Sequence, residues 1–279
     1  MTGEKLTPEP FEVSSGGVTL SGETTGSGPD VVLLHGLTAT RRYVVMGSKA
    51  LPRAGYRLTT FDARGHGDSS PAPSAEAYEY RDLVDDLGAV LDSLGVERAA
   101  LGGASMGAHT TMAFALAFPE RVAALVQITP AFDGRPRDLE EWDRLADGVA
   151  SGGIDGFLDV WEFGGDERWR ETAETVVRQR LGRHRDLQAV ADALRVVPRS
   201  MAFDGLEELP AVDVPALVVA SRDDADPGHP YAIGEEYARR LPRGRLVSEE
   251  PGHSPLAWQG ARLSNAIADF LRDGAGWGD

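Results

Sequence analysis

Short apolar runs alternate with helix-like segments along most of this chain. Residues 31–34 form a continuous run of valine and leucine, which is typical of a strand that is buried on both faces. Residues 56–61 predict another strand, and apolar residues then recur at helical spacing between positions 76 and 94, after which Gly95 ends the helix. Buried strands that alternate with amphipathic helices predict a mainly parallel sheet that is covered on both faces.

The same alternation extends through the rest of the chain. Residues 11–15 and 18–22 predict a hairpin around Gly16 and Gly17. Further strands are expected at 98–102, 121–128, 214–220 and 245–248, and further helices at 106–118, 231–241 and 257–271. The sequence therefore predicts an α/β fold with a mostly parallel, eight-stranded, twisted sheet and helices on both faces.

One long stretch interrupts this alternation. Between Pro130 and Pro210 the pattern is helical, with several glycines and three of the five tryptophans of the chain. We expect residues 131–210 to form a helical cap, or lid, over the carboxyl edge of the sheet, and residues 1–130 and 211–279 to form the core.

Charge and composition exclude several classes of function. The formal net charge is −16, which disfavours nucleic acids and anionic membrane surfaces as partners. The chain has no cysteine, so disulfides, thiolate nucleophiles and cysteine-based zinc sites are excluded. The first residues lack a basic flank with an apolar segment, and no run approaches the roughly 20 apolar residues of a membrane span. We expect a soluble, cytoplasmic protein, although an exported protein stripped of its signal would have the same pattern.

Residues 103–107 read Gly-Ala-Ser-Met-Gly and fit the pattern G-x-S-x-G. A strand-like run precedes them and a helix-like run follows, so they predict a sharp strand-to-helix turn that exposes the Ser105 hydroxyl. Such a turn needs small residues, which Gly103, Ala104 and Gly107 supply. The start of the following helix offers free N–H groups beside the serine, where an oxyanion is stabilised. Taken alone, the pattern is equally compatible with a strand-end turn and a capping serine.

A serine hydroxyl is a weak nucleophile until a base takes its proton, and the base needs an acid to hold its tautomer. In an open parallel sheet such groups meet at the carboxyl ends of the strands. His253 lies in a loop after the last predicted strand and is the candidate base. The other five histidines are assigned to turns, helices or the insertion: His35, His66, His109, His184 and His229.

The acid is expected in the loop that follows the strand ending at Ala220. Three aspartates crowd this loop, of which Asp224 is the first candidate. Asp223 and Asp226 remain alternatives, with solvated or helix-capping roles otherwise. Asp133, just past an earlier strand, is a further alternative.

These motifs together resemble the α/β-hydrolase-fold enzymes, and the resemblance covers nearly the whole chain. Residues 33–37, Leu-Leu-His-Gly-Leu, resemble the oxyanion turn of that family, and residues 61–69 resemble the loop after its fourth strand. Ser105 matches the nucleophile elbow, and Asp224 and His253 match the acid and the histidine of the catalytic triad, in the family's order along the chain.

The resemblance implies a hydrolase whose oxyanion hole is formed by the backbone N–H groups of Leu37 and Met106. Each such donor contributes roughly 3–4 kcal/mol of transition-state stabilisation. No metal or organic cofactor is expected. A serine at the elbow argues against haloalkane dehalogenases and epoxide hydrolases, whose members carry aspartate there.

The expected activity is that of a carboxylesterase-like serine esterase, which acts through an acyl-enzyme on small to medium, moderately apolar esters. Trp142, Trp161 and Phe163 are candidates to line the substrate pocket. Phe157 and Trp169 could line it as well, and in the alternative interpretation these aromatic residues pack the insertion's own small core.

Four arginines in the insertion form a basic cluster in an otherwise acidic protein: Arg178, Arg180, Arg183 and Arg185. A solvated helix face is the simplest interpretation of this cluster, and a site for a substrate carboxylate is the alternative.

Other activities remain open on the same residues. They are hydrolysis of a carbon–carbon bond, acyl transfer and, in a different class, non-catalytic binding of a ligand. The expected partner is a small-molecule ester, and nothing in the sequence indicates the oligomeric state.

Overall fold

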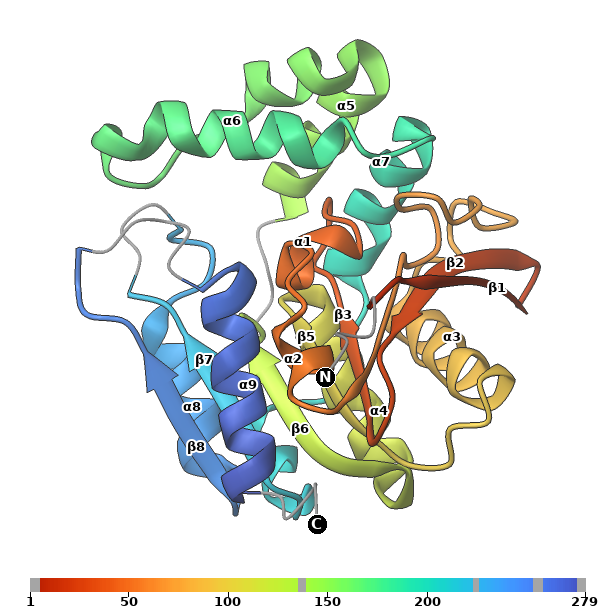
Figure 1. The fold of residues 1–279 in the computed structure, drawn as a ribbon. Helices are drawn as coiled ribbons and strands as arrows, with labels where there is room; N and C mark the ends of the chain where they lie inside the picture. Colours follow the sequence, from red (N-terminus) through yellow and green to blue (C-terminus); the bar gives the residue numbers. More distant parts are fainter. Residues whose placement is uncertain (1–5, 135–138, 223–225, 253–257, 275–279) are drawn as a thin grey trace.

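The computed structural model describes residues 6–134, 139–222, 226–252 and 258–274. In these residues the strands form one eight-stranded sheet in the order β1-β2-β4-β3-β5-β6-β7-β8 (Figure 1). β1 and β2 pair antiparallel, β2 joins β4 antiparallel, and every pairing from β4 to β8 is parallel. The predicted fold class is confirmed.

The strands lie close to their predicted positions. They are β1 (Glu9–Ser15), β2 (Val18–Thr25), β3 (Asp30–Leu34), β4 (Arg57–Phe61), β5 (Ala99–Ala104), β6 (Val122–Ile128), β7 (Ala216–Ala220) and β8 (Gly244–Ser248). Gly16 and Gly17 join β1 to β2 with φ of 53° and 84°, so both residues occupy the left-handed region that favours glycine in a hairpin turn.

Helices cover both faces of the sheet, as predicted. On one face lie α3 (Tyr80–Ser93), α4 (Met106–Ala117) and α8 (Tyr231–Arg240), and on the other lie α1 (Arg42–Val45), α2 (Ala50–Arg53) and α9 (Gly260–Gly274). Side chains of β3 alternate between the two cores: Val32 and Leu34 contact the first, and Val31 and Leu33 the second. Because each central strand is buried on both faces, the continuous apolar run that predicted β3 has its physical explanation.

Two boundaries differ from the prediction for local reasons. β5 continues to Ala104 because Gly103 and Ala104 still pair with β6. α3 begins at Tyr80 because the Asp82 carboxylate accepts a hydrogen bond from the Glu79 N–H and ends the preceding turn there.

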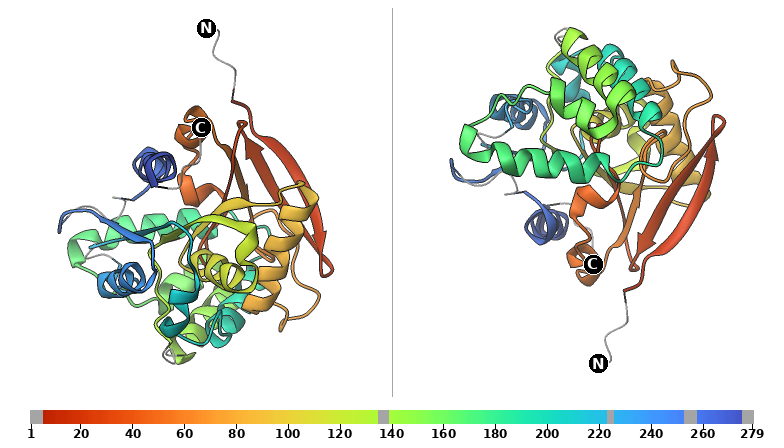
Figure 2. Two further views of the ribbon diagram at one scale, coloured as in Figure 1. Left: turned by 90° about the horizontal axis from the view of Figure 1, so that it is seen from below. Right: turned by 90° about the horizontal axis from the view of Figure 1, so that it is seen from above.

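The described residues between β6 and β7 contain three α-helices: α5 (Leu139–Val160), α6 (Arg170–Leu181) and α7 (Leu187–Val196). Figure 1 and the view from above in Figure 2 place α5 and α6 as a layer across one end of the sheet. These helices have a small core of their own, and Leu37, which follows β3, packs against it. We refer to residues 139–199 as the helical insertion.

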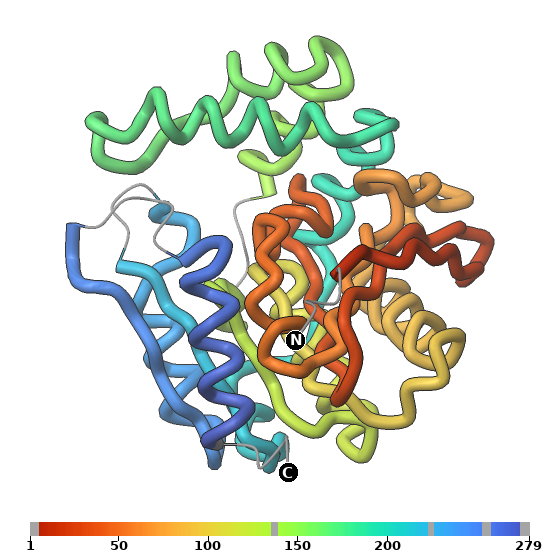
Figure 3. Tube along the Cα trace, in the orientation of Figure 1, coloured from red at the N-terminus to blue at the C-terminus, as the bar shows by residue number. Residues whose placement is uncertain are grey.

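Described residues that flank the insertion on its two sides lie close together, below the helices of the insertion in Figure 3. The rings of Phe132 and Phe203 pack edge to face with their centroids 4.7 Å apart. A Cβ placed on Gly134 would lie 3.4 Å from the Gly205 Cα. Both phenylalanines belong to the sheet's first core, so these flanking residues are anchored on the sheet. The division of the chain into a core domain and a cap domain stays a prediction.

None of the described helices is both long enough and apolar enough to cross a membrane.

Candidate active site

Ser105 occupies a strained turn between β5 and α4. Its φ and ψ are 50° and −113°, a combination that residues with a side chain rarely adopt. A Cβ on Gly103 would lie 2.4 Å from the backbone of Gly107, and one on Gly107 would lie 2.6 Å from the Leu34 carbonyl oxygen. The two glycines are therefore required by close backbone packing, which holds the turn at the end of β5.

The predicted oxyanion turn lies directly against this serine. A Cβ on Gly36 would lie 3.4 Å from the Ser105 Cβ and 3.3 Å from the Ala104 carbonyl oxygen. Leu37 is half-buried between this turn and the helical insertion, and Met106 is buried at the first position of α4. The structure thus brings Ser105 together with the turn that carries Leu37. The roles of the Leu37 and Met106 N–H groups as oxyanion donors stay a prediction.

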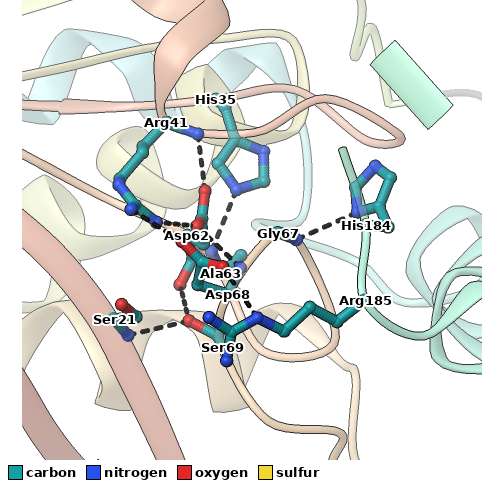
Figure 4. A network of polar contacts seen from close by, with 10 residues as sticks. All are labelled: Ser21, His35, Arg41, Asp62, Ala63, Gly67, Asp68, Ser69, His184 and Arg185. Atoms are coloured by element: carbon teal, nitrogen blue, oxygen red, sulfur yellow. Dashed lines mark hydrogen bonds and ion pairs between the residues drawn. The ribbon is translucent and has the colours of Figure 1, made fainter. Parts of the chain in front are cut away.

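A buried polar network holds the oxyanion turn to the loop after β4 (Figure 4). His35 Nε2 accepts a hydrogen bond from the Ala63 N–H at 2.9 Å. The Asp62 carboxylate, which is 1% exposed, forms an ion pair with Arg41 and accepts hydrogen bonds from the backbone N–H groups of Arg41 and Asp68. A Cβ on Gly67 would collide with that carboxylate at 2.2 Å, which explains the glycine in the Arg-Gly-His-Gly turn.

Three imidazoles pack beside this network, those of His35, His66 and His184. Burial lowers the pKa of His35 and lowers that of His66 well below its ordinary value. His184 comes from the insertion: its Nδ1 accepts a hydrogen bond from the Gly67 N–H, and its Nε2–H donates to the Thr38 carbonyl, each at 2.9 Å. This neutral histidine therefore ties the insertion to the oxyanion turn.

We expect this tie to weaken in acid. Burial lowers the pKa of His184 from 6.5 to about 4, so the unfolded chain binds a proton that the folded chain excludes between these values. The free energy of unfolding should therefore fall as pH drops from 6.5 toward 4. Urea titrations at several pH values should show a shallower fall for His184→Asn than for the wild type, because the variant lacks one of the buried histidines. Some fall should remain, since burial also lowers the pKa values of His35 and His66. Equal slopes in the two proteins would contradict the assignment.

Several predicted residues lie outside the described residues, namely His253, Asp223 and Asp224. Asp226 is described, and both of its carboxylate oxygens lie 2.8 Å from the His229 Nδ1. Burial raises the pKa of Asp226, but the nearby His229 imidazole and the Arg180 guanidinium together lower it by more than burial raises it. The net shift of the pKa is therefore downward. Asp226 is thus already engaged by a histidine other than the predicted base. Asp133 is half-buried past β6.

One functional candidate was not anticipated from the sequence. Glu249 follows β8 and is 4% exposed. Its Oε1 accepts hydrogen bonds of 2.6 Å from both the Ser221 hydroxyl and the Arg222 N–H, and its Oε2 accepts one from the Trp258 indole N–H. Burial raises the pKa of Glu249, but these bonds outweigh it and the net shift is downward. Glu249 therefore connects the residues just before the predicted acid loop to Trp258, just after the predicted base loop. The only signal for this role in the sequence is an acidic residue at the carboxyl end of a strand.

The aromatic residues of the insertion lie mostly in its own packing. Phe157 is buried in the insertion core, and Trp142 and Trp161 pack against that core. Phe163 contacts Trp161, with ring centroids 5.6 Å apart, and lies under the Arg170 guanidinium. Their predicted contact with substrate stays a prediction.

The predicted basic cluster divides into two kinds of residue. Arg178 pairs with Asp155 and Arg185 pairs with Asp68, and both arginines, like Arg183, are exposed. For these three the solvated interpretation holds. Arg180 is different, because its Nε is inaccessible to solvent and has no hydrogen-bond partner among the described residues.

The remaining histidine near the elbow has a structural role. His109 is buried on α4, and its Nε2 accepts hydrogen bonds of 3.0 Å from the Ala131 and Phe132 N–H groups. It thereby fixes the loop after β6. Within the described ranges, no group of three or more acidic or histidine side chains is arranged to hold a metal ion.

The sequence is similar to those of known hydrolases and related enzymes. A family model described as the alpha/beta hydrolase fold matches residues 29–259. A Bacillus subtilis (strain 168) protein provisionally named a 2-succinyl-6-hydroxy-2,4-cyclohexadiene-1-carboxylate synthase is 29% identical over 252 residues, which cover 86% of this chain and 89% of that protein. The 2-hydroxy-6-oxononadienedioate/2-hydroxy-6-oxononatrienedioate hydrolase of Paraburkholderia phymatum is 30% identical over 260 residues, 88% of each chain.

A solved structure is similar over almost the whole chain. It is a thermophilic esterase from Thermogutta terrifontis with malate bound, which matches at a TM-score of 0.75 and 25% identity over 96% of this chain and 99% of that one. Together with the family model, and with a sheet order and elbow that fit it, this shows that the chain belongs to the α/β-hydrolase fold family.

Proposed function

We propose that this hydrolase is a serine esterase that cleaves carboxylic esters of small to medium, moderately apolar substrates through an acyl-enzyme. The observation that carries the proposal is the position of Ser105. The serine occupies a strained turn at the carboxyl end of a central parallel strand, with the turn of Gly36 and Leu37 packed against it and the start of α4 directly after it.

The mechanism assigns one role to each predicted group. Ser105 Oγ attacks the acyl carbon while His253 takes its proton, and Asp224 orients His253 and stabilises its imidazolium. The tetrahedral oxyanion accepts hydrogen bonds from the Leu37 and Met106 N–H groups. His253 then protonates the leaving alcohol, and water releases the acyl group by the reverse sequence of proton transfers.

Hydrolysis of a carbon–carbon bond on the same residues is the second candidate. Two observations favour it as the alternative: a relative named as a hydrolase of oxo-dienedioates aligns over 88% of this chain, and an arginine with a covered, unpartnered Nε lies in the insertion. In that reaction the serine, or water activated by the same histidine, attacks a ketone carbon, and the leaving group is a stabilised carbanion.

Covalent labelling tests the proposal directly. A fluorophosphonate probe should label Ser105 in the wild type, and the variants His253→Ala and Asp224→Asn should block or strongly slow labelling. Asp223→Asn and Asp226→Asn serve as matched controls and should label normally. Product analysis on p-nitrophenyl butyrate and on a ring-fission diketone then separates the candidates. Labelling that survives His253→Ala would overturn the triad, and turnover of the diketone alone would overturn the esterase.

A further inference from the structure

Arg180 lies where the helical insertion spans the active-site edge of the sheet. Its helix, α6, is held to the core near both ends: a Cβ on Gly164, before the helix, would lie 3.1 Å from Pro227, and His184, after it, bonds to Gly67 and Thr38. Thr38 directly follows the predicted oxyanion residue Leu37. Figure 1 shows α6 lying across this end of the molecule. Arg180 belongs to the last turn of this helix.

The Arg180 side chain is unlike the other arginines of the insertion. Its Nε is covered and makes no hydrogen bond to a described residue. By contrast, seven arginines of the insertion form ion pairs within the described part of the chain: Arg144, Arg168, Arg170, Arg178, Arg185, Arg195 and Arg199. Arg183 forms none there but is exposed, so water solvates its charge.

The surroundings of Arg180 leave its charge incompletely compensated. Desolvation by burial lowers the pKa of its guanidinium, and Asp226 and Tyr43 only partly oppose this effect. The Asp226 carboxylate already contacts His229 through both oxygens. His184, the neighbouring histidine, is neutral, and the charge of Arg180 helps to keep its pKa low.

Burying a charge without a partner is unfavourable unless something else supplies the opposite charge. Arg180 has a covered, unpartnered Nε, and its helix ends three residues before His184, which bonds to the oxyanion turn. Its guanidinium is therefore a candidate ligand group. We propose that Arg180 binds a carboxylate of the substrate, so that the ester cleaved at Ser105 carries an anionic group on its acyl or alcohol part. This inference rests on the proposed esterase function and names its substrate class.

A carboxylate fits this position better than a phosphate does. A guanidinium and a carboxylate form two parallel hydrogen bonds, and their single charges cancel. A phosphate monoester carries up to two negative charges and needs further cations, whereas the charged neighbour that faces Arg180 is the acidic Asp226.

Substrate preference tests the proposal. The two substrates are the p-nitrophenyl monoester of glutaric acid and the same compound with its free carboxylate methylated. In the wild type kcat/KM should favour the anionic substrate, and Arg180→Gln should lower that preference by about 10-fold or more, in the range for truncated buried charge pairs. Arg180→Lys should retain part of it. Arg178→Gln, an exposed and ion-paired neighbour, should leave the preference unchanged. An unchanged preference in Arg180→Gln would overturn the proposal.

A binding measurement separates this proposal from the esterase assignment. Sodium glutarate should raise the thermal midpoint of Ser105→Ala protein, and 1,5-pentanediol with sodium chloride at equal ionic strength should not. The shift should disappear in Ser105→Ala/Arg180→Gln. If the wild type cleaves no ester but the Arg180-dependent shift is present, the esterase assignment fails and the carboxylate site stands. If glutarate produces no shift, the carboxylate site is rejected whatever the enzyme cleaves.

Stability distinguishes a binding role from a structural one. Removal of a guanidinium whose Nε is covered and unpartnered relieves a desolvation cost that Asp226 only partly offsets. Arg180→Gln without ligand should therefore melt at a higher temperature than the wild type. A structural arginine would give a lower melting temperature, and that result would count against the proposal.

Discussion

Ser105→Ala is expected to lower kcat/KM for p-nitrophenyl butyrate by about 10⁴-fold or more, as in other enzymes that lose a triad nucleophile. The loss follows from removal of the only proposed nucleophile, while the backbone that holds the turn stays the same. Initial rates measured across substrate concentrations, with far-ultraviolet circular dichroism as the folding check, test this. Ser151→Ala, an exposed serine of the insertion, is the matched control and should retain full activity. Turnover retained by Ser105→Ala would remove the basis of the mechanism.

Ser105→Gly adds a test of the strained turn. The positive φ of 50° costs about 1–3 kcal/mol for a residue with a Cβ, which exceeds the entropic cost of glycine of about 0.5–1 kcal/mol. The glycine variant should therefore be inactive yet unfold at higher urea concentration than the alanine variant. If the two inactive variants are equally stable, the turn stores no strain.

Gly107→Ala should destabilise the fold by about 3 kcal/mol or more, the upper end for an overpacked interior position. The added Cβ would lie 2.6 Å from the Leu34 carbonyl oxygen and 2.8 Å from that of His35. Both are backbone atoms, so no side chain can rotate away to relieve the contact. Urea unfolding measures the loss, and activity should fall with it because the same movement displaces the oxyanion turn.

Gly152→Ala is the control for this substitution. Nothing lies within 4 Å of a Cβ at Gly152, and its φ is not positive. Alanine there should leave stability unchanged or raise it by up to about 1 kcal/mol, because the unfolded chain loses freedom. Comparable losses in the two variants would mean that packing at the elbow is not what requires glycine.

Local patterns were sufficient to predict the sheet and the elbow. Residues 31–34 predicted β3 because a strand buried on both faces must be apolar throughout, and the structure confirms this. Residues 103–107 predicted the turn because only small residues allow it, and the clashes around Gly103 and Gly107 confirm that reason. In both cases a few consecutive residues carry the signal, even though the carbonyl oxygens that crowd Gly107 belong to Leu34 and His35.

Long-range partners could not be predicted in the same way. The bond between Gly67 and His184 joins residues 117 positions apart, and no periodicity indicates it. Glu249 bonds to Ser221, which follows β7, and to Trp258, which precedes α9, so its two partners lie far apart in the chain. Arg180 was grouped with three exposed arginines because spacing alone does not show which face of α6 the core covers. Such contacts depend on how the insertion sits on the sheet, which is a tertiary property.

The edge-to-face contact of Phe132 and Phe203 has a consequence for the length of the insertion. Residues that flank the insertion on both sides meet there, with ring centroids 4.7 Å apart. Because loop-closure entropy grows slowly with length, doubling the segment between these two rings would cost only about 0.6 kcal/mol. A longer or shorter insertion could therefore be accommodated while the two rings and the sheet core beneath them stay in place.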